Sequence, residues 1–348
     1  MIDFRYHVVS LVSVFIALAV GIVLGAGPLR GQLAEQLSTR VEQLGVERNQ
    51  LRSDKEVAEA GVRNRDAFTT QVMPTMVADR LRGHSVVLVS LPGATSALAE
   101  SLSTTLTAAG AELTGRVEIR ADWTAPARSE ARADLVAEWG KVLTTPSQQV
   151  NRTPQRAASS PAARPAGQDT QQVLRDLLAR GLVTANRLEV GESDPVGREV
   201  LAALADQELI ALRGRVSTRA DLAVVLAPAV QSLVPGQPTP SPSVVDPVPE
   251  WAGLTLTLDR SSGGVVLVGP ASSAGDGGTI AAIRAQKEST RLVSTVDTGG
   301  SPMGDVTAVY ALAEQVSGDG ASYGFAKGAV APVPSPVPAP VTAEGAAP

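Results

Sequence analysis

The sequence lacks several residue types on which common protein chemistries depend. It contains no cysteine and only two histidines, His7 and His84, among 348 residues. Disulfides, thiolate nucleophiles, iron–sulfur clusters and cysteine-based zinc sites are therefore excluded. A Ser-His-Asp triad would have to be built around His84. Most familiar enzyme chemistries therefore lack one of their residues, and we predict a protein that is not an enzyme.

Aromatic side chains are scarce, and the charges are nearly balanced. The 30 Lys and Arg against 35 Asp and Glu leave a net charge of −5, and aromatics are 3% of the chain. No basic stretch with interleaved aromatics is present, so nucleic acid is not an expected partner. Hydrophobic residues, at 44%, are numerous enough for one or two cores.

A long uncharged run lies near the N-terminus. Between Val8 and Leu29 no side chain is charged, and these 22 residues span roughly 33 Å as a helix. A cleaved signal peptide is the alternative, but the run exceeds the usual signal length and Pro28 follows the best cleavage position. We therefore interpret residues 1–28 as a transmembrane anchor. Gly21 and Gly25 have the small-xxx-small spacing of helix dimers.

The orientation of this anchor follows from the rest of the chain. Arg5 faces Arg30 and Arg40 across the span, so the positive-inside rule does not discriminate. A cysteine-free chain with Pro/Ala/Ser-rich tracts is typical of an exported envelope protein. We expect a single-pass membrane protein with a cytoplasmic N-terminus and an extracytoplasmic head, in an inner or an outer membrane.

The following segment, 29–76, is predicted to be a coiled-coil stalk. Residues 29–68 carry seven basic and seven acidic side chains, which is typical of a solvated helix. Apolar residues recur there with heptad spacing. The predicted partner is a second copy, in a dimer, and the alternative is a single amphipathic helix lying on the head. The predicted oligomer seam consists of Leu37, Val41, Leu44 and Leu51.

Residues 77–328 are predicted to form an α/β head with a parallel sheet. Short apolar runs alternate with stretches of helical spacing, as in parallel α/β folds. Three stretches hold 16 of the 24 prolines: 146–168 and 235–249, expected to be insertions in the head, and 329–348, expected to be a disordered tail. Strands are expected at 84–90, 111–119, 222–227, 264–269 and 291–296, and helices up to Ala109, at 129–143 and at 305–316.

Two stretches carry a resemblance. Residues 2–25 read IDFRYHVVSLVSVFIALAVGIVLG, and Ser294-Thr-Val-Asp297 is followed by Ala311-Leu-Ala-Glu-Gln315 and Tyr323-Gly324. The first resembles the N-terminal signature of the actinobacterial MctB family, and the second is similar to its later motifs. The order of anchor, coiled coil, head and tail also matches, so the resemblance covers nearly the whole chain.

The resemblance implies two different functions. The family is named for mycobacterial copper transport protein B, which implies an envelope protein of copper homeostasis or export, with a copper ion as a possible ligand. Corynebacterial members imply the alternative, a coiled-coil scaffold that regulates division enzymes such as peptidoglycan hydrolases. The implied partners are the membrane and a membrane-associated protein or a cell-wall hydrolase.

Candidate copper ligands are few. Cu(I) prefers thiolates and thioethers, and Cu(II) prefers imidazole. The one arrangement of interest is Met73 and Met76 with His84, although Pro74 interrupts the turn between the two methionines. The alternative is that both methionines fill gaps between stalk and head.

A second candidate lies at the end of a predicted strand. Asp297, with Ser294 and Thr295, occupies the position where open α/β sheets bind ligands, and the alternative is a capping aspartate. Glycine clusters at 275–278 and 299–304 have neither a P-loop ending nor dinucleotide spacing, so we interpret them as turns.

Overall fold

The computed structural model describes residues 4–26, 28–144, 169–192, 194–214, 216, 218–230, 246–318 and 320–335, without the side chains of 24–36, 38 and 144. The chain divides into two compact units, 1–65 and 66–348. Each unit is described by itself.

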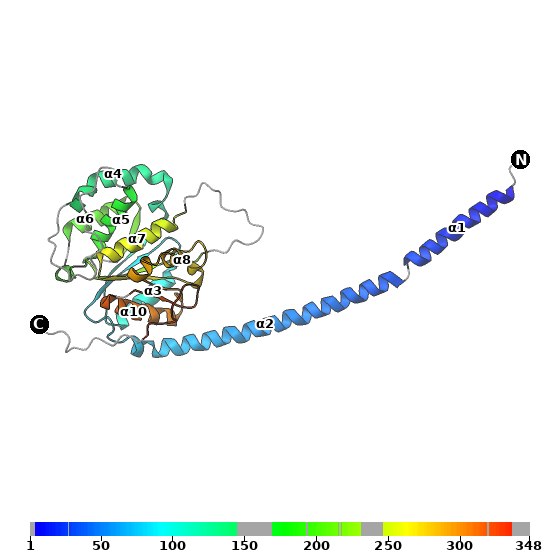
Figure 1. Ribbon diagram of the computed structural model, residues 1–348, viewed down its shortest axis with the longest axis horizontal. Coiled ribbons are helices and arrows are strands. Elements are labelled where there is room, and N and C mark those ends of the chain that lie inside the picture. The colour runs from blue at the N-terminus through cyan, green and yellow to red at the C-terminus, as the bar shows by residue number, and fades with distance from the viewer. Residues whose placement is uncertain are drawn as a thin grey trace. The chain divides into compact units, whose positions relative to one another are not determined.

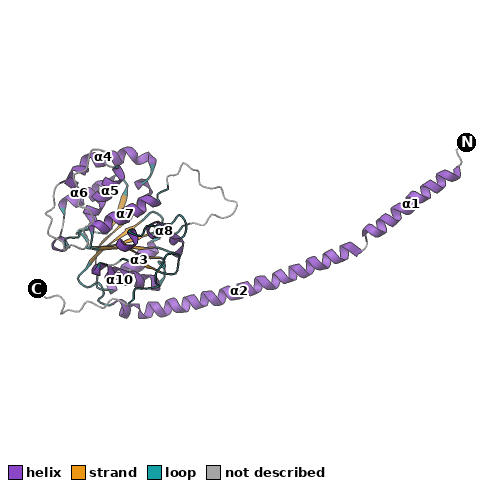
Figure 2. Cartoon of the chain, viewed as in Figure 1, coloured by secondary structure: helices purple, strands orange, loops and turns teal. Residues whose placement is uncertain are grey.

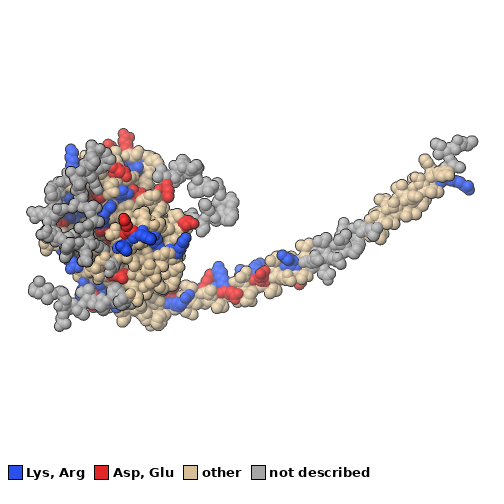
Figure 3. Space-filling model, in the orientation of Figure 1, with Lys and Arg blue, Asp and Glu red and all other residues tan. Residues whose placement is uncertain are grey.

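The first helix, α1 (Phe4–Ala26), is apolar. Its stretch Phe4–Val23 has a mean hydropathy of 2.3 over 20 residues, long and apolar enough to cross a membrane. Its described apolar side chains are largely exposed. Figure 3 shows charged side chains on α1 only near its N-terminal end. A helix that is apolar all round needs an apolar surrounding, which a bilayer supplies.

The second helix, α2, runs over 50 residues from Pro28 to Val77. Proline is well tolerated at a first helical position because its missing N–H has no intrahelical partner there. Ion pairs one turn apart line the helix, such as Lys55–Glu59 at 3.5 Å. The helix expected over 29–76 is present. The four seam residues are each exposed over more than half of their surface, and their pairing with another helix stays a prediction.

The head is built on a seven-stranded sheet of order β3-β2-β1-β4-β5-β6-β7 (Figure 2). Within the head, the first strand is β1. The strands β2 and β3 follow on one side of it, and β4 lies on its other side. The middle strands are Val- and Leu-rich and buried throughout, as strands covered on both faces must be. The strands are β1 (Ser85–Ser90), β2 (Glu112–Ile119), β3 (Ile210–Arg213), β4 (Leu222–Leu226), β5 (Gly264–Val268), β6 (Val293–Val296) and β7 (Ser322–Tyr323).

The expected wholly parallel sheet is corrected by one strand. β3 pairs antiparallel with β2, with Val117 opposite Leu212, whereas the other described pairs are parallel. β3 has only four residues, and its last residue is exposed. A short edge strand of this kind gives no long apolar run in the sequence, so its presence and direction were not predicted.

Helices cover both faces of the sheet (Figure 1). Successive side chains of β1 point to opposite faces. Val87 and Val89 belong to a core with α5, α6 and α7, and Val86 and Leu88 belong to a second core with α3, α10 and the end of α2. The head helices are α3 (Ser96–Ala108), α4 (Ser129–Trp139), α5 (Thr170–Leu182), α6 (Pro195–Asp206), α7 (Val248–Ser261), α8 (Thr279–Arg284), α9 (Ser289–Leu292) and α10 (Pro302–Ser317), with 3-10 turns at Ala121–Trp123, Pro126–Arg128, Gly140–Thr144, Arg187–Glu189 and Ala271–Ala274.

The proline-rich stretches differ in part from expectation. Residues 146–168 and 336–348 lie outside the described residues, as does most of the second stretch. α7 begins at Val248, inside the second stretch, because proline is compatible with a first helical turn. The expected disordered tail is wrong for residues 330 and 331, which pair with β7 and the residue after it: Val330 N–H donates to Ser322 O at 2.8 Å, and Gly324 N–H donates to Ala331 O at 3.0 Å.

A buried acid lies between α3 and α10. Asp305 is fully buried, and one oxygen of its carboxyl group accepts a hydrogen bond from the Ser101 hydroxyl. The other oxygen has no partner among the described residues. Burial raises the pKa of Asp305 to about 6, against the opposing effect of Ser101. Asp305 therefore keeps its proton to a higher pH in the folded head than in the unfolded chain.

We expect Asp305→Asn to stabilise the head near neutral pH. The pKa of Asp305 is higher in the folded protein than in the unfolded chain. The wild-type protein therefore loses stability as the pH rises from about 4 to about 6. Asparagine avoids this loss, so the gain is about 1–3 kcal/mol at pH 7.5 and close to zero at pH 4. Urea unfolding followed by tryptophan fluorescence measures it, since Trp123, Trp139 and Trp251 all lie in the head. The same gain at both pH values would contradict the assignment.

Candidate functional site

Asp297 follows strand β6 directly and is buried in an ion pair. The side chains of Asp297 and Arg284 are 1% and 4% exposed, and Arg284 Nη1 lies 2.8 Å from Asp297 Oδ2. The guanidinium comes from the last residue of α8. It also donates through Nε to Thr295 Oγ1 at 2.9 Å and through Nη2 to Tyr323 O at 2.9 Å. One arginine thus joins α8, β6 and β7.

The carboxylate of Asp297 also fixes the loop after β7. Its Oδ1 accepts from Phe325 N–H at 2.9 Å and its Oδ2 from Ala326 N–H at 3.1 Å. Gly324 has φ +126°, and a Cβ there would collide with the carboxylate. The Tyr323-Gly324 motif and the Asp297 motif, separated in the sequence, are therefore parts of one contact.

Ser294 completes this corner of the head. Its hydroxyl accepts from Gln315 Nε2 at 2.9 Å and from Ala321 N–H at 3.3 Å. The three residues predicted for ligand binding therefore lie together on β6 and just after it. Each of them binds other parts of the chain, as a capping aspartate and its neighbours do. A ligand at this position stays a prediction.

The three candidate copper ligands have protein contacts of their own. Met73 Sδ accepts from Thr105 Oγ1 at 3.4 Å, and its side chain packs against the α3/α10 core. Met76 is partly exposed, and its carbonyl oxygen accepts from Tyr310 OH at 3.1 Å. These contacts join the end of α2 to the head, which agrees with the packing role of methionine.

His84 is paired with an acid at the N-terminal end of the sheet. Its Nδ1 lies 2.6 Å from Asp221 Oδ2, while Asp221 Oδ1 accepts from Ser85 N–H at 2.7 Å. Burial would raise the pKa of Asp221, but the hydrogen bonds and charge of His84 and the bonds from Ser85 outweigh it and hold the pKa below its ordinary value. His84 therefore ties β1 to the start of β4. Its binding of copper remains a prediction.

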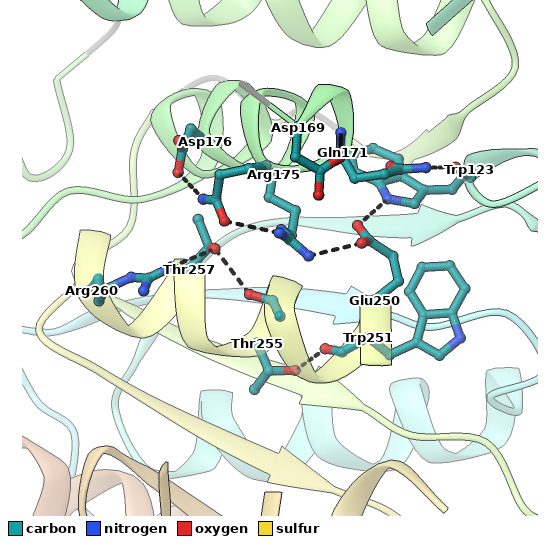
Figure 4. Close-up of polar contacts among 12 residues, drawn as sticks. Trp123, Asp169, Gln171, Arg175, Asp176, Glu250, Trp251, Thr255, Thr257 and Arg260 are labelled. Carbon is teal, nitrogen blue, oxygen red and sulfur yellow. Dashed lines mark hydrogen bonds and ion pairs between the residues drawn. The ribbon is translucent and has the colours of Figure 1, made fainter. Parts of the chain in front are cut away.

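A third polar cluster was not predicted from the sequence. Figure 4 shows Trp123 and Arg175 directed at Glu250, with Trp123 Nε1 at 2.9 Å from Oε1 and Arg175 Nη1 at 2.8 Å from Oε2. Burial raises the pKa of Glu250 above its ordinary value, partly offset by these two partners. The helical spacing at 170–182 would have revealed α5, but no local signal indicates a contact between residues 127 positions apart. The cluster joins α5 to α7.

Within the described part of the chain, no group of three or more His, Cys, Asp or Glu side chains is placed to hold a metal ion. The glycine clusters at 275–278 and 299–304 lie where the chain enters α8 and α10. These positions fit turns that lead into helices.

The comparisons with known proteins concern nearly the whole chain. The family model described as "Copper transport outer membrane protein, MctB" matches residues 1–334. The chain belongs to the MctB family. Proteins named "Copper transporter MctB" from Mycobacterium tuberculosis (strain H37Rv) and Mycobacterium bovis are 27% identical to it over 325 residues, 91% of this chain and 94% of theirs. The Mycobacterium leprae protein of that name is 27% identical over 323 residues. The resemblance inferred from the N-terminal and Asp297 motifs is thus confirmed.

We expect Asp297→Asn to destabilise the head by about 3–5 kcal/mol, because it leaves the Arg284 charge buried without its partner. Urea unfolding of the full chain in mild detergent measures the loss. Adding Arg284→Met removes that charge and should restore part of the stability. A loss below about 1 kcal/mol for Asp297→Asn would contradict a buried ion pair.

Proposed function

We propose that this protein is a membrane-anchored cell-envelope protein that acts in copper homeostasis or export. The single observation that carries this proposal is the MctB family match over residues 1–334. The apolar helix α1, long enough to cross a membrane, supports the anchor. The curated relatives are named as transporters, which fits a role other than catalysis.

The chemistry of the described residues favours an indirect part in copper handling. The chain offers no thiolate, and the three candidate ligands have contacts that hold α2, β1 and β4 to their neighbours. A single membrane helix encloses no lumen, so passage of copper would need an assembly or a separate channel. We therefore propose that the protein supports copper export as part of a larger assembly.

The stalk is proposed to form that assembly with a second copy of the chain. Leu37, Val41, Leu44 and Leu51 are largely exposed in the single chain, and heptad spacing places them on one stripe. Helix dimerisation would bury this stripe. We also propose a cytoplasmic N-terminus and an extracytoplasmic head.

The alternative, a scaffold for peptidoglycan hydrolases, is not favoured by the comparisons. The family description and the names of the relatives refer to copper transport and to no wall enzyme. A coiled-coil stalk is equally compatible with either function, so it does not separate them.

We expect the full chain in detergent to bind Cu(I) weakly, with a Kd nearer micromolar than the much tighter values of thiolate sites. If a Met/Met/His site exists, Met73→Leu, Met76→Leu and His84→Gln together abolish the binding measured by competition with a Cu(I) chelator. Because His84→Gln also removes the pair with Asp221, Asp221→Ala is the control: it removes the same pair and keeps the three ligands. A tight stoichiometric complex lost only in the triple variant would show that the protein itself carries copper.

We expect Leu37→Ser, Leu44→Ser and Leu51→Ser together to weaken a dimer of the full chain, because seam leucines supply most of its buried apolar area. Val46→Ser with Val57→Ser is a matched control, since both valines are exposed and lie off the heptad stripe. Analytical ultracentrifugation in detergent measures the dimer. A wild-type monomer at high concentration, or equal weakening by the control, would refute the predicted seam. If copper tolerance in cells falls with the seam variant and survives the ligand variant, the role in copper export is indirect.

A further inference from the structure

A small cavity lies where β1 ends and α3 begins. Its volume is about 230 Å³, and residues 90–96 form most of its wall, together with Ala99 of α3 and with Glu118 and Ile119 at the end of β2. β1 is the strand from which the chain runs to β2 on one side and later returns as β4 on the other. Open α/β sheets bind ligands beyond the carboxyl ends of their strands, and this cavity lies beyond the ends of β1 and β2.

The start of α3 supplies hydrogen-bond donors to this cavity. α3 has 13 residues and is capped by Thr95, whose hydroxyl accepts from Leu98 N–H at 3.4 Å. The N–H groups of Gly93, Thr95 and Ser96, which line the cavity, have no acceptor within the described part of the chain. The first N–H groups of a helix have no intrahelical partner, and the helix dipole favours negative charge beside them.

A buried hydroxyl points to a ligand independently of the helix. Ser90 is only 8% exposed, lines the cavity, and makes no side-chain hydrogen bond with any described residue. It lies two residues after Leu88, so its side chain is on the same face of the sheet as α3. Its hydroxyl oxygen is not fully enclosed, so a molecule in the cavity can reach it and accept its hydrogen bond.

The acid in the cavity wall does not prevent the binding of an anion. Glu118 is the charged residue among those that line the cavity. Both of its carboxylate oxygens accept from Arg213, through Nε and Nη2, each at 3.0 Å. This bidentate pair neutralises the charge of Glu118 and leaves its two oxygens engaged.

From these observations we propose that the cavity between β1 and α3 binds the phosphate group of a small phosphate ester. The cavity presents several donors that have no acceptor among the described residues: backbone N–H groups at the positive end of a helix and the hydroxyl of Ser90. A phosphate supplies three acceptor oxygens and up to two negative charges, and helix N-termini bind such groups. The Ser90 hydroxyl and the Ser96 N–H are the assigned contacts. The proposal is independent of copper handling and of the stalk.

The test uses the full chain in detergent with inorganic phosphate as the probe, measured by calorimetry at constant ionic strength. Ser90→Ala removes the hydroxyl and should weaken binding at least threefold. Ser96→Pro removes one N–H, and the fold tolerates it because Ser96 is the first helical residue and Thr95 before it is extended, with ψ 143°. It should weaken binding at least threefold as well.

Ser103→Ala is the matched control. Its hydroxyl is on the same helix, bonded to Ala99 O at 2.6 Å, and Ser103 is not among the residues that line the cavity, so binding should stay unchanged. Acetate, with two oxygens and one charge, should bind more weakly than phosphate. The proposal is overturned if phosphate does not bind at tens of millimolar, if acetate binds as tightly, or if Ser90→Ala binds like the wild type. Ser90→Ala decides the outcome if Ser96→Pro does not fold.

Discussion

Burial of the central strands on both faces is the constraint on which the head depends. β1, β4 and β5 are rich in Val and Leu, and exposing these side chains to water would be costly in free energy, so helices must pack on each side. Helical crossovers keep these strands parallel and bring their carboxyl ends to one edge. The ion pair at Asp297 and the cavity at Ser90 both lie just beyond strand ends because of this arrangement.

The polar groups at the ends of β6 and β1 differ in whether the chain supplies hydrogen-bond partners for them. At β6 the acid after the strand is satisfied by Arg284 and by the N–H groups of Phe325 and Ala326, which come from the segment after the short strand β7. At β1 the hydroxyl of Ser90 and the first N–H groups of α3 find no such partner among the described residues. The chain itself therefore satisfies the polar groups after β6, whereas those after β1 are available to the proposed ligand.

The sequence was sufficient to predict elements whose pattern of residues lies within one short segment. Short apolar runs indicated β1, β4, β5 and β6, which are buried along their whole length. β2, which is only partly buried, was also expected, at 111–119. The sequence was insufficient for β3, which is short and antiparallel, and for residues 330 and 331, which pair with β7 although they lie in a stretch expected to be disordered. It located Asp297 but not Arg284, since nothing in a sequence states which cation reaches a buried acid. The hydrogen bond between Trp123 and Glu250 was not predicted for the same reason.

The stalk is subject to the opposite constraint. Residues 37–65 of α2 expose their apolar stripe, and the helix contains Gly45 and Gly61, each of which costs roughly 1 kcal/mol relative to alanine. An isolated helix gains little from propensity alone, and most helical stability in proteins comes from packing of an apolar face. The ion pairs at Lys55 and Arg63 add only tenths of a kcal/mol. The head has two apolar cores of its own, whereas the described apolar side chains of the stalk lie exposed, and this difference is the reason for proposing a second copy of the chain as the partner of the stalk.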